Sequence, residues 1–521
     1  IARAIASRLA NIFDSPVIHD RLKFYDDKEA QLVQPREAIN RIPHYCSGCP
    51  HNTSTKVPEG SRAVAGIGCH YMAHWIEGDS TKTFTQMGGE GITWLGQAPF
   101  TTTKHIFTNL GDGTYFHSGL LAIRAAVAGK VNITYKILYN DAVAMTGGQH
   151  VDGYLDVPMI TRQVHAEGVG RIVITSDDPD KYRTAHGLKE GLAPGVEVFH
   201  RRELDRIQKE LRELEGVTIL IHDQTCAAEK RRRRKRGEFP DPDRRIFINE
   251  RVCEGCGDCG KKSGCLSVLP VETALGRKRK IDQSSCNKDY SCVEGFCPSF
   301  VSVSGAKLKK SSGGNKAGLD SMSTLPDPKL PALHEPYGIM ITGVGGTGVV
   351  TIGQVLAMAA HLDNKGITVL DMAGLAQKGG SVWSHVRIAD SQDKLHAVRI
   401  AAGDANLVLG CDLVVTAAEE ALAKMREGFS HVVVNSYESP TSAFLKNPDV
   451  RFPARAMKDA IIESVGGSHF AEVNATRIAT ALMGDGIAAN MFMLGYAWQQ
   501  GLVPVSLEAI MAAVELNGAA V

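Results

Sequence analysis

Seven cysteines lie close together in one short part of the chain, between Cys253 and Cys297. The first three, in "CEGCGDCGKKSGC", have the C-x2-C-x2-C spacing with which one loop can reach three corners of an iron–sulfur cubane. Cysteines at this spacing, in a chain without an export signal, favour reduced thiolates that hold metal over disulfides. The segment therefore predicts electron-transfer chemistry, with a zinc-binding pair as the alternative.

The end of this segment, "CNKDYSCVEGFCP", has one cysteine fewer than the ferredoxin half-motif C-x2-C-x2-C-x3-C-P. Asp289 stands in the second slot, and one extra residue precedes the final Cys-Pro. With this spacing and ending, the segment resembles the two-cluster bacterial ferredoxins. A carboxylate is a hard and weaker iron donor, so we expect Asp289 to bind the corner iron or that iron to be lost, leaving a three-iron cluster.

This resemblance implies two clusters with crossed ligation, in which the last cysteine returns to the first cluster. The ligands of one cluster would be Cys253, Cys256, Cys259 and Cys297. The ligands of the other would be Cys265, Cys286, Asp289 and Cys292.

A second group of polar residues follows two strand-like runs nearer the N-terminus. Gly111-Asp112-Gly113 follows "IFTNL", and Asn140 follows "YKILY" 28 residues after Asp112. Two strand ends can bring a carboxylate and an amide oxygen to one Mg²⁺, and glycines let the backbone approach a diphosphate. This GDG…N pattern, with "TGGQ" behind it, is that of thiamine diphosphate (TPP) enzymes. Asp112, Asn140 and the Ala142 carbonyl would be the protein's magnesium ligands.

Upstream of this site, "HYCSGCPH" and "GIGCHYM" place three more cysteines. Together with the GDG…N pattern they resemble the 2-oxoacid:ferredoxin oxidoreductases, the family that includes pyruvate:ferredoxin oxidoreductase. The resemblance implies a proximal [4Fe–4S] cluster beside the cofactor. Its ligands would be Cys46, Cys49, Cys69 and Cys226. Zinc ligation by the first pair is the alternative.

The order of the segments narrows the resemblance to the fused bacterial indolepyruvate ferredoxin oxidoreductases. "MGGEGITWLGQAPF" and "AGLAQKGGSVWSHVR" are also typical of that group, and the resemblance runs from about residue 36 to 521. It implies oxidative decarboxylation of a 2-oxoacid, an aryl pyruvate such as indolepyruvate. Coenzyme A would take the acyl group, and electrons would pass through three iron–sulfur clusters to ferredoxin.

The resemblance also implies which residues contact the cofactor. They are Gly68, Cys69, Gly111, Asp112, Gly113, Thr114, Asn140, Ala142, Met145 and Thr146. Met145 stands where the pyruvate enzymes carry an Asn, which indicates a different substrate pocket. His117 could face the substrate as a catalytic residue, although an isolated His is more often structural. The glutamate that activates the aminopyrimidine lies, in this family, in a domain absent from this sequence.

The elements that must position these residues are those of an α/β protein. Apolar runs such as "RIVITS" and "VTILIHD" alternate with helical stretches such as "SGLLAIRAAVAG". We expect residues 1–35 to be the tail of a preceding domain or a linker, 36–230 a TPP-binding domain with a parallel sheet and the proximal cluster, 231–303 a small ferredoxin-like two-cluster insert, 304–336 a linker, and 337–521 a truncated Rossmann-like γ-type domain.

The basic run "KRRRRKRG", at 230–237, interrupts the alternation. We interpret it as a solvated connector. The alternatives are a docking patch for an acidic protein and a nucleic-acid contact, although no base-reading module accompanies the run.

The last domain opens on "GVGGTG", which satisfies G-x-G-x-x-G, and Asp371 lies 23 residues beyond Gly348. Alone, this pattern predicts a dinucleotide site. The motif is weak because any tight strand-to-helix turn can use it, and the resemblance identifies this region with the γ-type domain. An iron–sulfur module of a nicotinamide or flavin dehydrogenase is therefore the alternative function, and a non-oxidative TPP decarboxylase with structural clusters is a third. We expect Cys411 to be a core residue on a strand.

The composition is that of an ordinary globular protein, with 521 residues, 43% hydrophobic content and a net charge of +1. This charge predicts no general attraction to nucleic acid or to an anionic membrane. No apolar run reaches the ~20 residues of a membrane span, and no secretory signal is present. We expect a cytoplasmic homodimer. The chain begins at Ile1 rather than Met, and we expect it to be a fragment of a longer polypeptide.

Overall fold

The fold is described from a computed structural model, which describes residues 2–30, 39–151, 153–185, 187–305, 325–372 and 378–518. Parts of the predicted tail 1–35, of the predicted linker 304–336 and of the stretch 373–387 therefore lie outside the described residues, as does the side chain of Thr146. The chain forms two compact units. The central unit comprises residues 43–306, and the terminal unit comprises residues 1–42 and 307–521.

The central unit is built on a seven-stranded sheet in the order β2-β1-β3-β4-β9-β5-β8, and every neighbouring pair is parallel. The strands are β1 (Ala63–Ala65), β2 (Thr81–Phe84), β3 (Ile106–Gly111), β4 (Ile133–Tyr139), β5 (Arg171–Ser176), β8 (Glu197–His200) and β9 (Val217–Asp223). All residues of β3 and β9 are buried, as expected of parallel strands covered on both faces. The predicted α/β class with a parallel sheet is confirmed.

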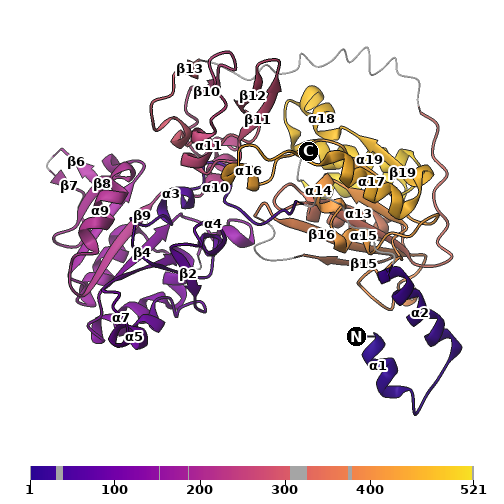
Figure 1. Cartoon of the computed structure of the whole chain (residues 1–521), viewed down its shortest axis with the longest axis horizontal. Helices are drawn as coiled ribbons and strands as arrows, with labels where there is room; N and C mark the ends of the chain where they lie inside the picture. Colours follow the sequence, from indigo (N-terminus) through magenta and orange to yellow (C-terminus); the bar gives the residue numbers. More distant parts are fainter. Residues whose placement is uncertain are drawn as a thin grey trace. The chain divides into compact units, whose positions relative to one another are not determined.

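Helices cover both faces of this sheet (Figure 1). Alternate residues of β9 point to opposite sides: Ile219 and Ile221 belong to one apolar cluster, and Leu220 belongs to another. The first cluster includes α7 (Leu120–Ala128) and α8 (Val157–Ala166), and the second includes α9 (Leu204–Leu211). The shorter elements of the unit include α3 (His51–Ser54), α4 (Ala73–Ile76), α5 (Ile92–Gln97), α6 (Asp112–Thr114), and the pair β6 (Arg183–Thr184) and β7 (Gly187–Leu188).

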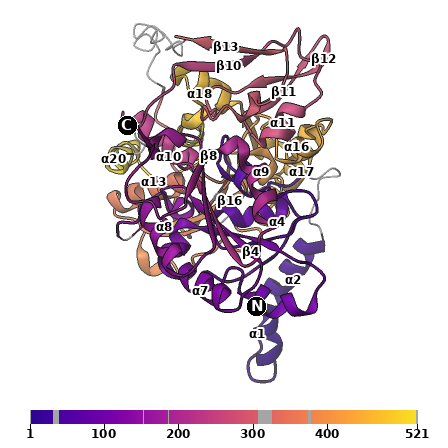
Figure 2. The ribbon, with the colours of Figure 1, turned by 90° about the vertical axis from the view of Figure 1, so that its left-hand side faces the viewer.

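The cysteine-rich segment adds two small antiparallel pairs to the same unit (Figure 2). β10 (Arg244–Ile248) pairs with β13 (Phe300–Ser304), and β11 (Val268–Thr273) pairs with β12 (Gly276–Ile281). The helix α11 (Asp258–Ser263) lies between β10 and β11 in the chain. The apolar cluster of this segment includes Cys253 and Cys265 beside a few aliphatic side chains. Such a small core usually needs cross-links or bound metal for stability.

The interpretation of the basic run as a solvated connector is only partly right: Lys235 and Arg236 are exposed, but other cations of the run are largely buried. Most of it forms α10 (Ala227–Lys235), and its cations pair within the unit. Lys230 Nζ lies 2.5 Å from Asp177 Oδ2, and Arg233 Nη1 lies 2.5 Å from Asp141 Oδ2. These basic side chains are only 13% and 16% exposed. The partner carboxylates are far away in sequence, so a local charge pattern could not reveal them.

The terminal unit contains a six-stranded sheet in the order β15-β16-β14-β17-β18-β19, in which β16 is antiparallel to both neighbours. Its strands are β14 (Tyr337–Val344), β15 (Gly366–Asp371), β16 (Ser381–Ala389), β17 (Leu407–Gly410), β18 (His431–Asn435) and β19 (Phe470–Val473). One face packs on α13 (Val349–Leu362), α19 (Ala489–Gln499) and α20 (Leu507–Asn517). The other packs on α14 (Leu413–Thr416), α15 (Glu419–Leu422) and α17 (Ala454–Val465). The remaining helices are α16 (Ala443–Lys446) and α18 (Ala475–Met483).

The N-terminal segment packs on this terminal unit. It contains α1 (Ala2–Leu9) and α2 (Pro16–Ala30), and Arg21 of α2 pairs with Asp404 at 2.5 Å. Arg41 makes a buried ion pair with Asp412 at 2.6 Å. No helix among the described residues combines the length and apolar character needed to span a bilayer.

Candidate functional site

The structure brings Asp112 and Asn140 together at the carboxyl ends of two neighbouring parallel strands, β3 and β4. Oδ2 of Asp112 accepts hydrogen bonds from the backbone N–H groups of Asn140 and Asp141, each at 3.0 Å. Oδ1 accepts one from the N–H of Gly113 at 2.9 Å. Three backbone donors thus fix the carboxylate at the strand ends.

The polar atoms around this carboxylate suit a divalent cation. Oδ1 of Asn140 is buried and accepts no hydrogen bond from the described residues, which is costly unless another group binds it. Burial raises the pKa of Asp112 to about 6, against the three backbone hydrogen bonds. A bound cation would offset that burial, because an opposite charge favours the ionised carboxylate. Carboxylate and amide oxygens are also the donors that Mg²⁺ prefers.

The glycines of this region serve two purposes. A Cβ at Gly113 would meet only Val143 Cγ2, at 3.8 Å, so the space beside this backbone is open to a ligand group. At Gly68 a Cβ would lie 2.6 Å from Cε1 of His70, and at Gly111 it would lie 3.1 Å from the same atom. These two glycines leave room for a buried imidazole beneath the turn.

Other expected cofactor contacts lie on the adjoining turns. Thr114 Oγ1 donates to the carbonyl of Ile67 at 3.4 Å, which links the GDG turn to the loop of Gly68 and Cys69. Ala142 is buried, and Met145 is half-buried in the short turn Ala144–Thr146.

His117 lies on a π-helical turn (Tyr115–Gly119) and is exposed. Its Nδ1 is 2.8 Å from Oγ of Ser118. The structure places it one turn beyond Asp112, and its catalytic role stays a prediction.

The sequence did not single out a group of buried polar residues behind the GDG turn. Glu90 is fully buried, accepts the N–H of Gly88 at 2.8 Å through Oε2, and has no hydrogen-bond partner for Oε1 among the described residues. Burial raises the pKa of Glu90 and lowers that of His70 to about 4. A Cβ on Gly66 would lie within 3 Å of both side chains. The glycines around Glu90 in "MGGEG" were the available signal.

Four cysteines from three distant parts of the chain gather near this site. Cys46 and Cys49 lie on the loop before α3, Cys69 begins a short helix, and Cys226 caps α10 just after β9. Burial raises the pKa of Cys49 well above its ordinary value, and the nearby Cys46, Cys226 and Cys69 raise it further. A thiolate here needs a compensating positive charge, which iron would supply.

One backbone hydrogen bond joins the cysteine group to the carboxylate–amide pair. The N–H of Cys226 donates to the carbonyl of Asn140 at 2.9 Å, and the N–H of Gln224 donates to Tyr139 at 3.1 Å. The end of β4 and the segment after β9 are therefore held side by side. The two sets of ligand-type residues adjoin each other.

The ferredoxin-like segment places six of its seven cysteines in two neighbouring groups, Cys253, Cys256 and Cys259 in one and Cys265, Cys286 and Cys292 in the other. Burial raises the pKa of Cys259 to about 11, Arg279 lowers it, and Cys256 and Cys253 raise it. Cys297, at the other end of the segment, has its Sγ 3.1 Å from Oγ of Ser299.

In the second group, burial raises the pKa of Cys292 to about 12, with further contributions from Cys265, Cys286, Cys259 and Asp289. Within the described residues, no three His, Cys, Asp or Glu side chains converge on a single-ion position. A cubane binds each ligand to a different iron, so its ligands need not converge in that way.

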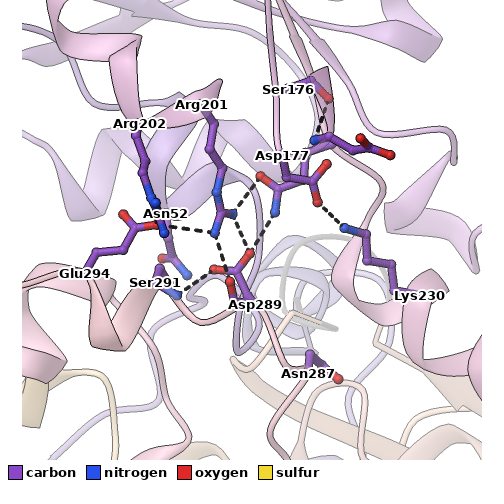
Figure 3. Close-up of polar contacts among 12 residues, drawn as sticks. Asn52, Ser176, Asp177, Arg201, Arg202, Lys230, Asn287, Asp289, Ser291 and Glu294 are labelled. Atoms are coloured by element: carbon purple, nitrogen blue, oxygen red, sulfur yellow. Dashed lines mark hydrogen bonds and ion pairs between the residues drawn. The ribbon is translucent and has the colours of Figure 1, made fainter. Parts of the chain in front are cut away.

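Asp289 makes specific contacts outside its own segment. Its Oδ1 pairs with Arg201 Nη1 at 2.5 Å and accepts from Gln224 Nε2 at 2.8 Å (Figure 3). Both partners belong to the part of the unit that carries the seven-stranded sheet. Ligation of iron by Asp289 stays a prediction.

The first glycine of the glycine-rich turn in the terminal unit, Gly343, is closely packed by protein atoms, whereas the nearest atoms to a Cβ on Gly348 would lie 3.9–4.0 Å away. A Cβ at Gly343 would lie 2.6 Å from Val349 Cγ2 and 3.1 Å from Cβ of Cys411. Cys411 is buried directly after β17, which agrees with the predicted core position. Asp371 ends β15, but the antiparallel β16 separates that strand from β14. In the dinucleotide fold, the acidic residue belongs to the parallel βαβ unit of the glycine turn, so the arrangement departs from that fold.

Two parts of the chain match known families. Residues 66–222 match the family described as thiamine pyrophosphate enzyme, C-terminal TPP-binding domain. Residues 338–519 match the family described as pyruvate ferredoxin/flavodoxin oxidoreductase. These two parts of the chain are thus similar to TPP-binding enzymes and to pyruvate ferredoxin/flavodoxin oxidoreductases, in agreement with the resemblance seen in the sequence.

Relatives found by sequence include subunits of indolepyruvate oxidoreductases. Subunit IorA of Thermococcus kodakarensis is 25% identical over 293 residues, which are 52% of this chain and 41% of that subunit. Subunit IorB of Methanothermobacter thermautotrophicus is 29% identical over 181 residues, 35% of this chain and 87% of that subunit. The chain therefore spans less than half of the IorA relatives it matches.

Among solved structures, pyruvate oxidoreductase subunit PORC of Thermotoga maritima is 22% identical. The match covers 35% of this chain and 85% of that subunit, with a TM-score of 0.26.

Proposed function

We propose that this chain takes part in the TPP-dependent oxidative decarboxylation of a 2-oxoacid, with electrons delivered to ferredoxin. The observation that supports this most directly is the 2.9 Å hydrogen bond from Cys226 to Asn140. It joins a proposed cluster ligand to a proposed magnesium ligand. Such closeness suits an enzyme in which electrons released at the cofactor must leave one at a time over a short distance.

In this proposal Asp112, Asn140 and the carbonyl of Ala142 hold Mg²⁺, and the open side of Gly113 admits the diphosphate. TPP, when bound, supplies the electron sink that lets a 2-oxoacid lose CO₂. The backbone donors around Asp112 keep its carboxylate oriented toward the metal, and Thr114 holds the turn against the neighbouring loop. In this proposal Met145 lines the substrate pocket.

The cysteines hold the electron-transfer groups. Cys46, Cys49, Cys69 and Cys226 carry the proximal [4Fe–4S] cluster. The two outer clusters take Cys253, Cys256, Cys259 and Cys297, and Cys265, Cys286, Asp289 and Cys292. A thiolate-rich chain of this kind suits a reducing compartment such as the cytoplasm.

The names of the IorA and IorB relatives support indolepyruvate as the substrate. Met145 in place of the Asn of the pyruvate enzymes agrees with a larger, apolar side chain on the substrate. Coenzyme A would accept the acyl group, and the working protein would be a homodimer.

The test is an assay of the purified protein, together with the domain that bears the aminopyrimidine-activating glutamate. A panel of 2-oxoacids is supplied with TPP, Mg²⁺ and coenzyme A, and reduction of a viologen dye is followed. We expect aryl pyruvates to be the best substrates. The Cys226→Ala variant should lose viologen reduction, whereas Cys411→Ala, a matched change in the terminal unit, should retain it.

Two outcomes would contradict the proposal. Release of CO₂ without dye reduction would favour a non-oxidative decarboxylase with structural clusters. Dye reduction that requires a nicotinamide and ignores 2-oxoacids would favour the dehydrogenase module.

A further inference from the structure

A buried ion pair joins the sheet-bearing part of the central unit to the loop that carries Asp289. Arg201 begins a short 3₁₀ helix (Arg201–Glu203) after β8, and its guanidinium points toward Asp289 (Figure 3). Nη1 lies 2.5 Å from Oδ1 of Asp289, and Nη2 donates to the backbone carbonyl of Asp289 at 2.9 Å. The two side chains are only 8% and 11% exposed. The Arg201 guanidinium therefore binds both the side chain and the backbone carbonyl of Asp289.

Gln224 completes the contact and connects it to the proximal cysteines. Its Nε2 donates to Oδ1 of Asp289 at 2.8 Å, and its Oε1 accepts from Arg201 at 3.0 Å. Gln224 is buried and stands two residues before Cys226. Oδ1 of Asp289 is thus occupied by two donors.

The second carboxylate oxygen is held far less firmly. The one hydrogen bond that the described residues give to Oδ2 of Asp289 is a long one, 3.4 Å, from the N–H of Ser291. Asp289 is also among the groups that raise the pKa of Cys292. The two carboxylate oxygens of Asp289 therefore differ. Oδ1 accepts two short hydrogen bonds, whereas Oδ2 accepts only the long one from Ser291 within the described residues, and Asp289 interacts with Cys292.

The Asp289 loop also rests on the loop of the first two proximal cysteines. Asn287 Nδ2 donates to the carbonyl of Ser47 at 2.8 Å. A Cβ on Gly48, which has a φ of +67°, would lie 2.7 Å from Cβ of Asp289. Larger residues at position 48 are excluded by both the conformation and the contact. Asp289 thus lies between the ligand loops of two proposed clusters.

We propose that Arg201 is a positioning residue for the Asp289 corner of the outer cluster formed with Cys265, Cys286 and Cys292. It holds Oδ1, turns Oδ2 toward the corner iron, and keeps that oxygen a weak donor. This inference rests on the proposed function, in which these residues hold a cluster.

The physical reason is the usual effect of partners around a metal ligand. Hydrogen bonds to a ligating carboxylate fix its orientation and tune the metal. A guanidinium paired with the carboxylate withdraws charge that would otherwise reach the iron. A fixed positive charge near a cluster also stabilises its reduced, more negative form. Arg201 should therefore raise the reduction potential of that cluster.

The test is a redox titration of the holoprotein followed by electron paramagnetic resonance, with iron content measured in parallel. In Arg201→Met, the reduction equilibrium of the Asp289 cluster should become about tenfold less favourable, a fall of about 59 mV for one electron. Arg201→Lys keeps the charge but lacks the rigid planar fork with which the guanidinium binds the side chain and the backbone carbonyl of Asp289. Its resonance line shape should change, and its midpoint should move less.

The neighbouring residue Arg202 provides a matched control. Arg202 contacts Glu294 of the same loop at 3.3 Å, but its side chain is 69% exposed. Arg202→Met should leave the midpoint and the spectrum unchanged. Asp289→Cys should give a conventional four-iron signal, which identifies the cluster, and adding Arg201→Met to that variant should shift it by less than the single change does.

The outcomes distinguish the role of Arg201 from the proposed ligation of the cluster by Asp289. Wild-type protein without a resonance that responds to Asp289→Cys would contradict the ligand assignment and this inference with it. A responsive resonance that Arg201→Met leaves unchanged, at full iron content, would contradict the inference alone. If Arg201→Met does not fold, Arg201→Lys decides, and an unaltered spectrum in that variant would overturn the inference.

Discussion

Both units of this protein place a glycine-rich turn at the carboxyl end of a buried strand, but the two turns are built differently. After β3, Gly113 faces open space, and the nearby Asn140 retains a buried oxygen without a partner. At the end of β14, Gly343 faces Val349 and Cys411, with no room for a methyl group. The first turn is shaped to admit a ligand, and the second is shaped to pack a helix against its sheet.

The difference shows what a glycine motif does and does not predict. A missing Cβ permits close approach, but it does not say whether a ligand or the protein itself approaches. The polar atoms around the turn decide this. At the GDG turn they are a carboxylate, an amide and buried groups such as Glu90, whereas at Gly343 of "GVGGTG" the neighbours Val349 and Cys411 belong to an apolar core.

The largest effect is expected from removing the acidic residue of the GDG turn. Asp112→Ala should weaken TPP and Mg²⁺ binding by more than about a hundredfold, because the loss of even an outer-shell partner costs 10–100-fold. Iron content should stay unchanged, since no proposed iron ligand is altered. Binding is measured by calorimetry and iron by a colorimetric assay.

Asp371→Ala is the matched control for that change. Asp371 is a carboxylate at the end of a strand, but it belongs to the other unit. TPP binding should be unaffected. An Asp112→Ala protein that still binds TPP with normal affinity would contradict the assignment of the first turn.

An intermediate effect is expected from adding one methyl group to each turn. Gly343→Ala should destabilise the terminal unit by about 1–3 kcal/mol, the usual cost of overpacking a core. Gly113→Ala should cost less than about 1 kcal/mol of stability, because the space is open and its backbone suits alanine. It should nevertheless weaken TPP binding. Denaturant unfolding followed by tryptophan fluorescence measures the stabilities.

The contrast between the two turns would be contradicted if Gly113→Ala were the more destabilising of the two variants. Equal destabilisation by both changes would mean that the GDG turn is also closed by packing. A stable Gly343→Ala protein would mean that the second turn has space for a ligand after all.

The sequence predicted those parts of the molecule whose signals are local. Strands such as "IFTNL" and "VTILIHD" are continuous apolar runs, and they form the middle of the parallel sheet. Asp112 and Asn140 could be placed together because parallel strands end at one edge of a sheet. Cys411 could be placed in the core because its neighbours are apolar.

What the sequence could not predict depends on pairs that are distant along the chain. Arg201 and Asp289 are 88 residues apart, and neither stands in a recognisable motif with the other. The burial of Lys230 and Arg233 in the basic run was missed for the same reason, since their partners Asp177 and Asp141 come from other loops. Ion pairs of this kind depend on tertiary structure, and the local composition does not predict them.

A small effect is expected from Cys411→Ala. The thiol is buried beside Gly343, so its removal leaves a small cavity that should cost about 1 kcal/mol. Neither iron content nor TPP binding should change, because Cys411 lies in the unit without the other cysteines. Loss of iron from this variant would show that the packing interpretation is wrong.

The smallest expected effect is that of a nicotinamide on the second turn. A ligand that binds only the folded protein stabilises it by about 2.7 kcal/mol at a hundred times its dissociation constant. TPP with Mg²⁺ should therefore raise the unfolding temperature of the central unit. NADH or NADPH at the same concentration should leave the terminal unit unchanged, because Gly343 is filled by Val349 and the strand of Asp371 is separated from β14 by β16. Differential scanning calorimetry measures both shifts in one experiment, and Asp112→Ala should remove the first. A shift with NADH that Asp371→Ala abolishes would restore the dinucleotide interpretation. Both turns would then bind a ligand, and they would differ only in which ligand each binds.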